Sequence, residues 1–153
     1  MKLDKLREQS PLLRALSNTE LDLFESVSTE RRLAAGEILF EEAGPADTFY
    51  FVAGGKVGLE LTAPGKEPIV IQTLGPGDLV GVSWLFQPYR WNWRARAVVD
   101  TDLVAVDATL IRAHLEKNRD LALEVLTVVA AELVGRLHRT RIQLLDLYRG
   151  STT

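Results

Sequence analysis

The segment Leu74-Gly75-Pro76-Gly77-Asp78-Leu79-Val80-Gly81 joins two apolar runs through a tight chain reversal. Glycine accepts a positive φ and proline fixes φ at about −65°, which makes residues 75–78 a strong turn signal. Comparable signals recur on both sides, at Ala35-Gly36, Ala43-Gly44-Pro45, Gly54-Gly55 and Pro64-Gly65-Lys66. Short apolar runs separate the turns, and residues 57–61 alternate with the period of a strand. The pattern predicts seven or eight strands over residues 32–106, folded as a small antiparallel barrel or jelly roll.

Two short amphipathic helices are predicted before the strands, over residues 10–27. Ser10 precedes Pro11, which places a capping hydroxyl before a proline at the first helical position. Ser17 and Glu20 have the spacing of a capping box, and apolar residues follow at helical intervals. The chain therefore enters the β-roll from a helical segment.

Helical periodicity returns over residues 107–149, first in a short segment and then in a long helix that begins after Asn118. Apolar residues of the long helix recur in alternating steps of three and four, as in a coiled-coil heptad. The seam predicted for homodimerisation consists of Leu126, Ala130, Leu133, Leu137, Thr140 and Leu144. A helix of about 30 residues is about 45 Å long, which exceeds what a barrel of this size can cover. The alternative, in which the same stripe packs on the chain's own barrel, stays open.

The chain has 153 residues, of which 46% are hydrophobic and 25% charged, with a net charge of −3. These values fit one globular domain over residues 1–153 with a single core. The chain lacks the roughly 18 consecutive apolar residues of a membrane-spanning helix, and its N-terminal residues are charged. We therefore expect a cytoplasmic protein without a membrane partner. The acidic balance argues against a nucleic-acid partner.

The residue types of the chain do not favour a metal site or a catalytic site. The chain has no cysteine, which excludes disulfides, thiolate zinc sites and iron–sulfur clusters. His114 and His138 lie outside residues 32–106, so a metal enzyme of the cupin type is excluded as well. Asp100 and Asp102 alternate near a strand end without an accompanying base or nucleophile. The sequence therefore predicts no metal site, no catalytic residues and no enzyme activity.

In this order of elements, four stretches resemble the cyclic nucleotide-binding domain family, which includes bacterial catabolite activators and regulatory subunits of kinases and channels. Residues 35–40 resemble its early strand, residues 51–57 its Gly-x-Val hairpin, residues 74–81 the start of its phosphate cassette and residues 95–98 the strand that leaves the cassette. The resemblance spans residues 10–149. It implies a mainly β fold with flanking helices: an eight-stranded jelly-roll β-barrel, short N-terminal helices and a long C-terminal dimerisation helix.

The same resemblance implies a ligand-binding cassette. Gly77 and Gly81 would let the backbone approach a ligand, and a short helical turn after Gly81 would direct N–H groups at an anion. In the family, a glutamate follows the second glycine and accepts a hydrogen bond from the ribose 2′-hydroxyl, whereas this chain has Val82. The cassette arginine is best matched by Arg90 and next by Arg94, and either would neutralise a cyclic phosphate.

Further residues of the cassette suit a planar anionic ligand. Ser83 offers a hydroxyl to a phosphate oxygen, and three tryptophans crowd residues 84–93, where an indole stacks well on a base. On the long helix, the positions that contact the base in the family match Arg136 and Leu137. The predicted ligand-binding residues are Gly81, Val82, Ser83, Trp84, Arg90, Trp91, Asn92, Trp93 and Arg94.

Two functions agree with these residues. The first is a stand-alone regulatory or sensory domain that binds cyclic AMP, cyclic GMP or a related anionic ligand and signals to an unknown output protein. In the second, the indoles pack the barrel mouth as core, and the domain is a degenerate, non-binding scaffold with Trp91 and Trp93 as anchors for a partner protein. The family's winged helix would follow the long helix, and we expect no DNA recognition of that kind from a chain that ends at Thr153. The basic residues of 136–141 fit a solvated helix face better than a nucleic-acid contact.

Overall fold

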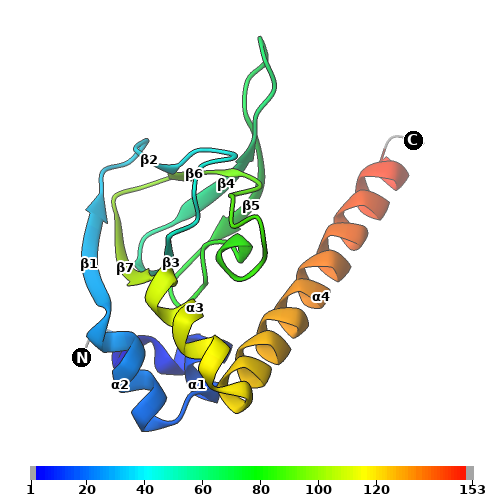
Figure 1. Cartoon of the computed structure of the whole chain (residues 1–153). Helices are drawn as coiled ribbons and strands as arrows, with labels where there is room; N and C mark the ends of the chain where they lie inside the picture. The colour runs from blue at the N-terminus through cyan, green and yellow to red at the C-terminus, as the bar shows by residue number, and fades with distance from the viewer. Residues whose placement is uncertain (1–2, 151–153) are drawn as a thin grey trace.

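The computed structural model describes residues 3–150 of the chain. Helices at both ends of the sequence flank a β-roll (Figure 1). In chain order the elements are η1 (Asp4–Gln9), α1 (Pro11–Ala15), α2 (Asn18–Ser26), β1 (Ser28–Leu33), β2 (Ile38–Phe40), β3 (Thr48–Gly54), β4 (Val57–Leu61), β5 (Ile69–Leu74), η2 (Ser83–Leu85), β6 (Arg94–Ala97), β7 (Thr101–Asp107), α3 (Ala108–Lys117) and α4 (Arg119–Gly150).

The N-terminal helices begin at the predicted capping residues. The Ser10 hydroxyl accepts a hydrogen bond from the Leu13 N–H at 3.2 Å, with Pro11 at the first helical position. At α2 the capping box is complete, because the Glu20 N–H donates to the Ser17 hydroxyl and the Ser17 N–H donates to the Glu20 carboxylate. Two bounds differ from the prediction: η1 adds a helical segment before Ser10, and β1 begins at Ser28, before the predicted start of the roll at residue 32.

The strands form two antiparallel sheets, with the orders β1-β7-β3 and β2-β6-β4-β5. The predicted mainly β fold with flanking helices is confirmed. Within residues 3–150, pairing defines two sheets with seven strands, which agrees with the seven or eight predicted from the turn pattern and is one fewer than the eight that the resemblance implies. The reason lies in residues 79–90, which meet other strands only in the isolated bridges Phe51–Leu79 and Pro45–Arg90 and otherwise fold into η2 and turns.

An aromatic cluster lies between the roll and the helices. The Phe49 ring meets Phe24 of α2 edge-on, with ring centroids 6.2 Å apart, and stacks on Trp84 of η2 at 3.8 Å. All three side chains are fully buried. Burial of large aromatic rings is a major stabilising term, so this cluster fixes the cassette helix η2 against β3.

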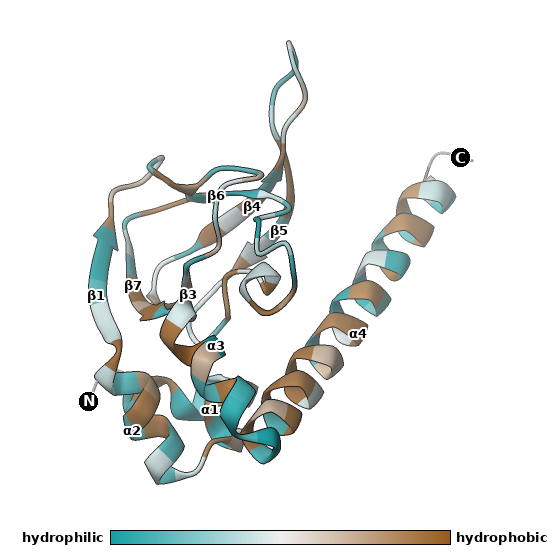
Figure 2. Cartoon of the chain, in the orientation of Figure 1, coloured by the Kyte–Doolittle hydropathy of each residue, from teal (hydrophilic) through white to brown (hydrophobic). Residues whose placement is uncertain are grey.

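The long helix α4 runs away from the roll and its C-terminal end stands clear of the strands (Figure 1). Hydrophobic and hydrophilic residues alternate along its length (Figure 2). Leu137 is 51% exposed and Leu144 is 61% exposed. The heptad stripe therefore does not pack on the chain's own roll, which contradicts the alternative interpretation. None of the helices within residues 3–150 is long and apolar enough to cross a membrane.

Candidate functional site

A groove of about 640 Å³ lies between the roll and α4. Its walls come from β4 and β5, from the cassette segment 81–93 and from α4. Seven predicted ligand-binding residues line it: Gly81, Val82, Ser83, Arg90, Trp91, Asn92 and Trp93. Three predicted seam residues, Leu133, Leu137 and Thr140, line it as well, together with Arg136. The structure therefore brings both sets of predicted residues to one place.

Trp91 forms a fixed wall of this groove. Its indole is only 4% exposed and lies parallel to the Phe40 ring, with centroids 3.9 Å apart and an interplanar angle of 7°. Its backbone is held on both sides, because its N–H donates to the Gly44 carbonyl at 3.0 Å and its carbonyl accepts from the Ala43 N–H at 2.8 Å. Burial removes Trp91 as an exposed anchor for a partner protein.

Both cassette glycines have a positive φ, and each allows a close contact within the protein. At Gly81 (φ +79°), an added Cβ would lie 2.8 Å from Cζ3 of Trp91. At Gly77 (φ +87°), it would lie 2.5 Å from the Gln9 backbone. Both glycines thus pack closely within the protein, against an indole and against η1, and Gly81 also lines the groove.

Two predicted site residues lie outside the groove. Trp84 is in the core, stacked on Phe49, and its Nε1–H has no hydrogen-bond partner among the described residues. Arg94 lies on the other face of the sheet, where its Nε donates to the Glu60 carboxylate at 2.8 Å. Arg96 reaches the same carboxylate at 3.3 Å, as expected from the alternation of a strand. Arg94 is thus paired with Glu60, and of the two arginines matched to the cassette position only Arg90 lines the groove.

Arg90, Asn92 and Trp93 are the exposed members of the set. The Arg90 guanidinium makes a long hydrogen bond, 3.4 Å, to the Ala43 carbonyl, and it is exposed. Trp93 is 37% exposed at the groove. A cation and an accessible indole in one groove suit a ligand that is planar and anionic.

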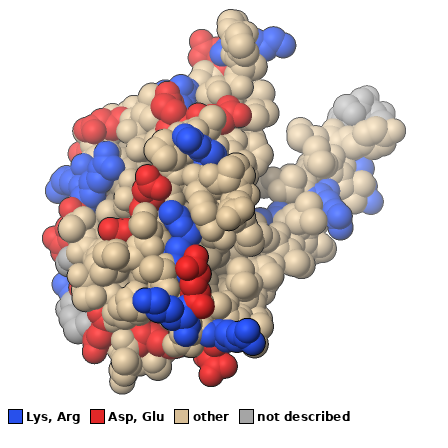
Figure 3. Space-filling model, viewed as in Figure 1, with Lys and Arg blue, Asp and Glu red and all other residues tan. Residues whose placement is uncertain are grey.

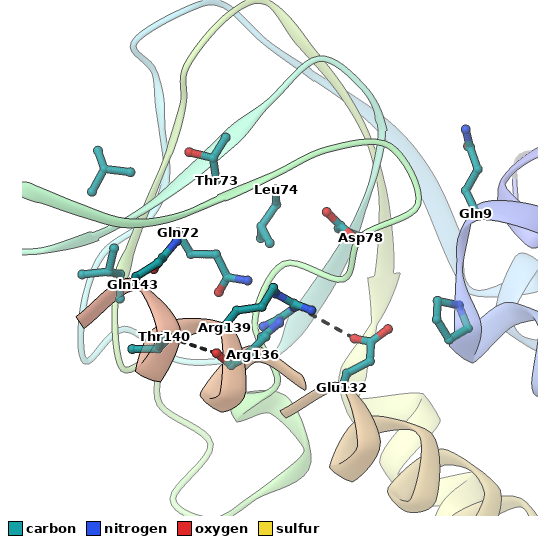
Figure 4. A pocket seen from close by; sticks show the side chains of 13 residues that line it. Gln9, Gln72, Thr73, Leu74, Asp78, Glu132, Arg136, Arg139, Thr140 and Gln143 are labelled. Atoms are coloured by element: carbon teal, nitrogen blue, oxygen red, sulfur yellow. Dashed lines mark hydrogen bonds and ion pairs between the residues drawn. The ribbon is translucent and has the colours of Figure 1, made fainter. Parts of the chain in front are cut away.

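Arg136 of α4 connects the groove with a second cavity. Its Nη2 lies 3.9 Å from the Glu132 carboxylate (Figure 4). The same Nη2 donates to the Leu79 carbonyl at 3.2 Å. The second cavity, of about 930 Å³, lies between α4, β5 and the N-terminal helices, and polar side chains predominate in it. Burial raises the pKa of Glu132 above its ordinary value, against the opposing effect of the nearby Arg136.

Arg112 of α3 is a positioning residue that sequence reasoning missed. Its Nη1 donates to the Trp84 carbonyl at 2.8 Å and to the Ala46 carbonyl at 3.0 Å. Its guanidinium carbon lies 4.1 Å from the centroid of the Tyr89 ring. These partners are far from Arg112 in the sequence, and no motif marks the residue. Arg112 therefore contacts the cassette at two places, Trp84 and Tyr89.

The surface does not gather charge of one sign on the face that Figure 3 shows, where basic and acidic side chains intermingle over the roll. In residues 3–150, no group of three or more His, Asp or Glu side chains is placed to hold a metal ion. The groove itself is thus the feature that combines concavity, apolar walls and accessible cations.

Comparison with known proteins agrees with this architecture. The family model described as "Cyclic nucleotide-binding domain" matches residues 30–118. The chain is 35% identical over 135 residues to the cyclic AMP receptor protein of Thermus thermophilus, which covers 88% of this chain and 61% of that protein. It is 28% identical over 112 residues to the CRP-like cAMP-activated global transcriptional regulator of Mycobacterium tuberculosis, covering 73% of this chain and 48% of the relative. The chain thus spans about half to three-fifths of the length of these relatives.

Solved structures give the same result. The catabolite activator protein of Thermus thermophilus superposes with a TM-score of 0.70 at 31% identity, over 91% of this chain and 63% of that chain. The N-terminal domain of a transcriptional regulator from Streptomyces coelicolor superposes with a TM-score of 0.69 at 28% identity, over 91% of this chain and 94% of that chain. Sequence and fold agree, and the chain belongs to the cyclic nucleotide-binding domain family.

Proposed function

We propose that this chain is a regulatory domain that binds a small planar anion, a cyclic nucleotide or a related ligand, in the groove between the roll and α4. One observation carries the proposal: residues of the cassette and residues of α4 line the same cavity. A ligand there contacts both parts, so it favours the relative position of the roll and α4 that suits it best. The relatives named as cyclic AMP receptor protein and cAMP-activated regulator support this class of ligand.

The electrostatics of the groove support an anionic ligand. Of the described residues that line it, none is acidic, whereas Arg90 and Arg136 approach from the cassette and from α4. Its apolar walls, which include Phe86, Trp93 and Leu137, suit a planar group. Glu60 and its two arginines lie on the opposite face of β4 and leave this balance unchanged.

Val82 sets the expected affinity for a cyclic mononucleotide. A carboxylate at this position would accept a hydrogen bond from the ribose, and a hydrogen bond to a charged group contributes roughly 1.5–3 kcal/mol. Without it, we expect binding about ten to a hundred times weaker than in a site that has the glutamate. A related ligand that needs no hydrogen-bond acceptor at position 82 is therefore a strong competitor for the site.

The proposal includes a homodimer formed through the exposed stripe of α4. The accessible surfaces of Leu126, Leu137 and Leu144 support it, because large apolar side chains in a heptad pattern are normally covered by a second helix. An output protein would then receive the signal from α4 in the cytoplasm. The domain acts by binding in this proposal, and no catalytic step is part of it.

The test measures binding and stability together. Purified protein is inspected by mass spectrometry for a bound molecule and then titrated with cyclic AMP, cyclic GMP and cyclic di-GMP by calorimetry and thermal unfolding. A ligand at 100 times its Kd adds about 2.7 kcal/mol, which raises the Tm of a chain of this size by about 5–10 °C. Arg90→Ala should abolish the shift, while Arg32→Ala, an exposed arginine on β1, should keep it.

A second function is favoured by a specific observation: Trp91 fills the space beside Gly81 where the cassette was expected to open to a ligand. A non-binding scaffold that presents Trp93 to a partner protein fits that packing. It is the conclusion if no ligand co-purifies, if none of the three nucleotides shifts the Tm, and if Arg90→Ala changes nothing.

A further inference from the structure

The strand β5 has a free edge. In the sheet order β2-β6-β4-β5 it lies at one end and pairs only with β4. On its other side, the backbone of residues 69–73 makes no hydrogen bond to a described residue. In an antiparallel pair, alternate residues exchange hydrogen bonds with the partner strand, so the residues between them direct their N–H and C=O groups outward. These outward groups are a template for another extended segment.

The side chains of β5 do not protect this edge. Exposed edges are commonly blunted by charged side chains or by proline, and residues 69–74 contain neither. The charged residues and the proline of the preceding hairpin, at positions 66–68, end where the strand begins. Ile69 is 63% exposed and Val70 is 53% exposed. The edge therefore combines unpaired backbone groups with accessible aliphatic side chains.

The polar cavity of about 930 Å³ runs along this edge. Residues 70–74 all line it, although successive side chains of a strand point to opposite faces of the sheet. A cavity that touches five consecutive residues thus faces the edge of the strand. Arg139 and Gln143 of α4 line the opposite side (Figure 4). An extended segment in the cavity would have β5 on one side and α4 on the other.

The α4 side of the cavity offers a cation for such a segment. Arg136 already donates to the Leu79 carbonyl and lies 3.9 Å from the Glu132 carboxylate. Arg139 is exposed, acts on Glu132 only at longer range, and makes no hydrogen bond or ion pair with another described residue. A carboxylate on the incoming segment would form a charge-assisted hydrogen bond with this guanidinium.

The remaining polar groups also suit an extended segment. Asp78 accepts a hydrogen bond from the Gly75 N–H at 2.8 Å, so one of its oxygens is already engaged. The carboxamide of Gln143 can both donate and accept, and it stands where the outer edge of an added strand would lie. Backbone groups on both edges of the segment would therefore find partners.

We propose that an extended segment of a partner protein, carrying an acidic side chain, binds in this cavity as a fifth strand beside β5. A free segment fits better than a strand of a second copy, because α4 stands where the next strand of that copy's sheet would have to lie. Arg139 and Gln143 are outside the stripe proposed for dimerisation, so a dimer leaves them available. The inference goes beyond the proposed function and requires no anion in the groove.

The test uses the full chain without nucleotide and the blocked peptide acetyl-Ser-Val-Thr-Glu-Thr-Val-Ser-amide. One matched peptide has lysine in place of glutamate, and another carries N-methyl groups on its Val and Thr amides, which removes backbone donors. Amide hydrogen exchange followed by NMR reports on each residue of β5. Fluorescence anisotropy of labelled peptides gives the Kd.

The outward amides of β5 should exchange rapidly in the free protein, and the glutamate peptide should slow their exchange by about tenfold or more. It should bind about five times more tightly than the lysine peptide, and the N-methylated peptide should not bind. Arg139→Gln should remove the preference for glutamate. Arg141→Gln is the matched control and should keep it, because Arg141 is exposed on α4 and does not line the cavity.

Four results would overturn the inference. Protection of the outward amides before any peptide is added would show that the edge is already covered, and a dependence on protein concentration would identify a second copy as the cover. Neither slower exchange nor increased anisotropy at about 1 mM glutamate peptide would show that no segment adds to β5. Equal binding of the N-methylated peptide would exclude strand pairing. Equal affinities of the glutamate and lysine peptides would exclude the role of Arg139. All four leave the proposed function intact, because nucleotide binding is measured separately.

Discussion

Gly81→Ala tests whether the wall of the groove is rigid. The residue has a φ of +79°, and a Cβ there would lie 2.8 Å from the Trp91 ring. A positive φ costs an L-residue about 1–2 kcal/mol. About 0.4–1 kcal/mol of this cost is offset, because alanine lowers the conformational entropy of the unfolded chain. Trp91 cannot move aside easily, because Phe40 stacks on it and its backbone is hydrogen-bonded at both its N–H and its carbonyl. Forcing extra atoms into such packing costs about 1–3 kcal/mol more.

Gly65→Ala separates the two contributions. Gly65 has a φ of +72°, and nothing lies within 4 Å of the position of its Cβ, so this variant reports the backbone effect alone. We expect Gly81→Ala to be about 2 kcal/mol less stable than Gly65→Ala, which is a Tm lower by about 4–8 °C in a chain of this size. Urea titration and calorimetry measure both variants.

A third variant makes the prediction specific. Trp91→Phe removes the ring atom that the new methyl group would meet, so it should be less harmful in the Gly81→Ala background than in the parent chain. Equal stabilities of Gly81→Ala and Gly65→Ala, to within about 0.5 kcal/mol, would refute the reasoning and show that the indole yields.

Three other outcomes follow from the described contacts. Glu60→Ala removes the nearer, buried carboxylate from the partly buried Arg94, which keeps only the more distant and exposed Glu41, and it should lower the free energy of unfolding by about 3–5 kcal/mol. Glu41→Ala should lower the free energy of unfolding by less than about 1 kcal/mol, and equal losses in urea titration would contradict this prediction. Leu144→Asp puts a charge on the exposed stripe and should give monomers in sedimentation experiments, an expectation that a monomeric parent would defeat. Burial raises the pKa of Glu132, so the folded state binds this proton more tightly than the unfolded state does. The stability that this proton contributes is present below the ordinary pKa of 4.5 and is lost as the pH rises through the raised pKa. Glu132→Gln should therefore have a higher Tm than the parent at about pH 7 and a similar one at about pH 4, whereas a pH-independent difference in Tm would argue against it.

Local rules explain why the order of elements could be predicted. The capping box of Ser17 and Glu20 and the positive φ at Gly36, Gly65 and Gly77 depend on neighbours within a few residues. Such features leave a direct signal in the sequence. The alternation of Arg94 and Arg96 also predicted correctly that the two side chains share a face.

Features that depend on the order of the strands could not be read from spacing. The partner of Arg94 follows from β4 lying beside β6, which places Glu60 opposite it, and no motif encodes that neighbour. The three tryptophans illustrate the same limit. Trp84 lies in η2 and turns into the core, Trp91 follows the isolated bridge Pro45–Arg90 and walls the groove, and Trp93 stays accessible. The sequence left two roles open for the whole cluster, ligand stacking and core packing, and the structure gives the three residues different surroundings.

The contacts of Arg112 connect the cassette to α3, and α3 leads directly into α4. Asn118 is the single residue between α3 and α4, and its carboxamide and carbonyl oxygens accept hydrogen bonds from the first turn of α4. Arg112 lies about 9 Å from this joint at the helical rise, and the far end of α4 lies about 48 Å from it. If α3 and α4 turn as one body, a shift of about 1 Å where the cassette meets Arg112 becomes about 5 Å at the tip of α4. Arg112 on α3 contacts the cassette, and α4 carries the exposed apolar stripe. A small movement of the cassette would therefore produce a larger displacement of the surface of α4 that a partner would meet.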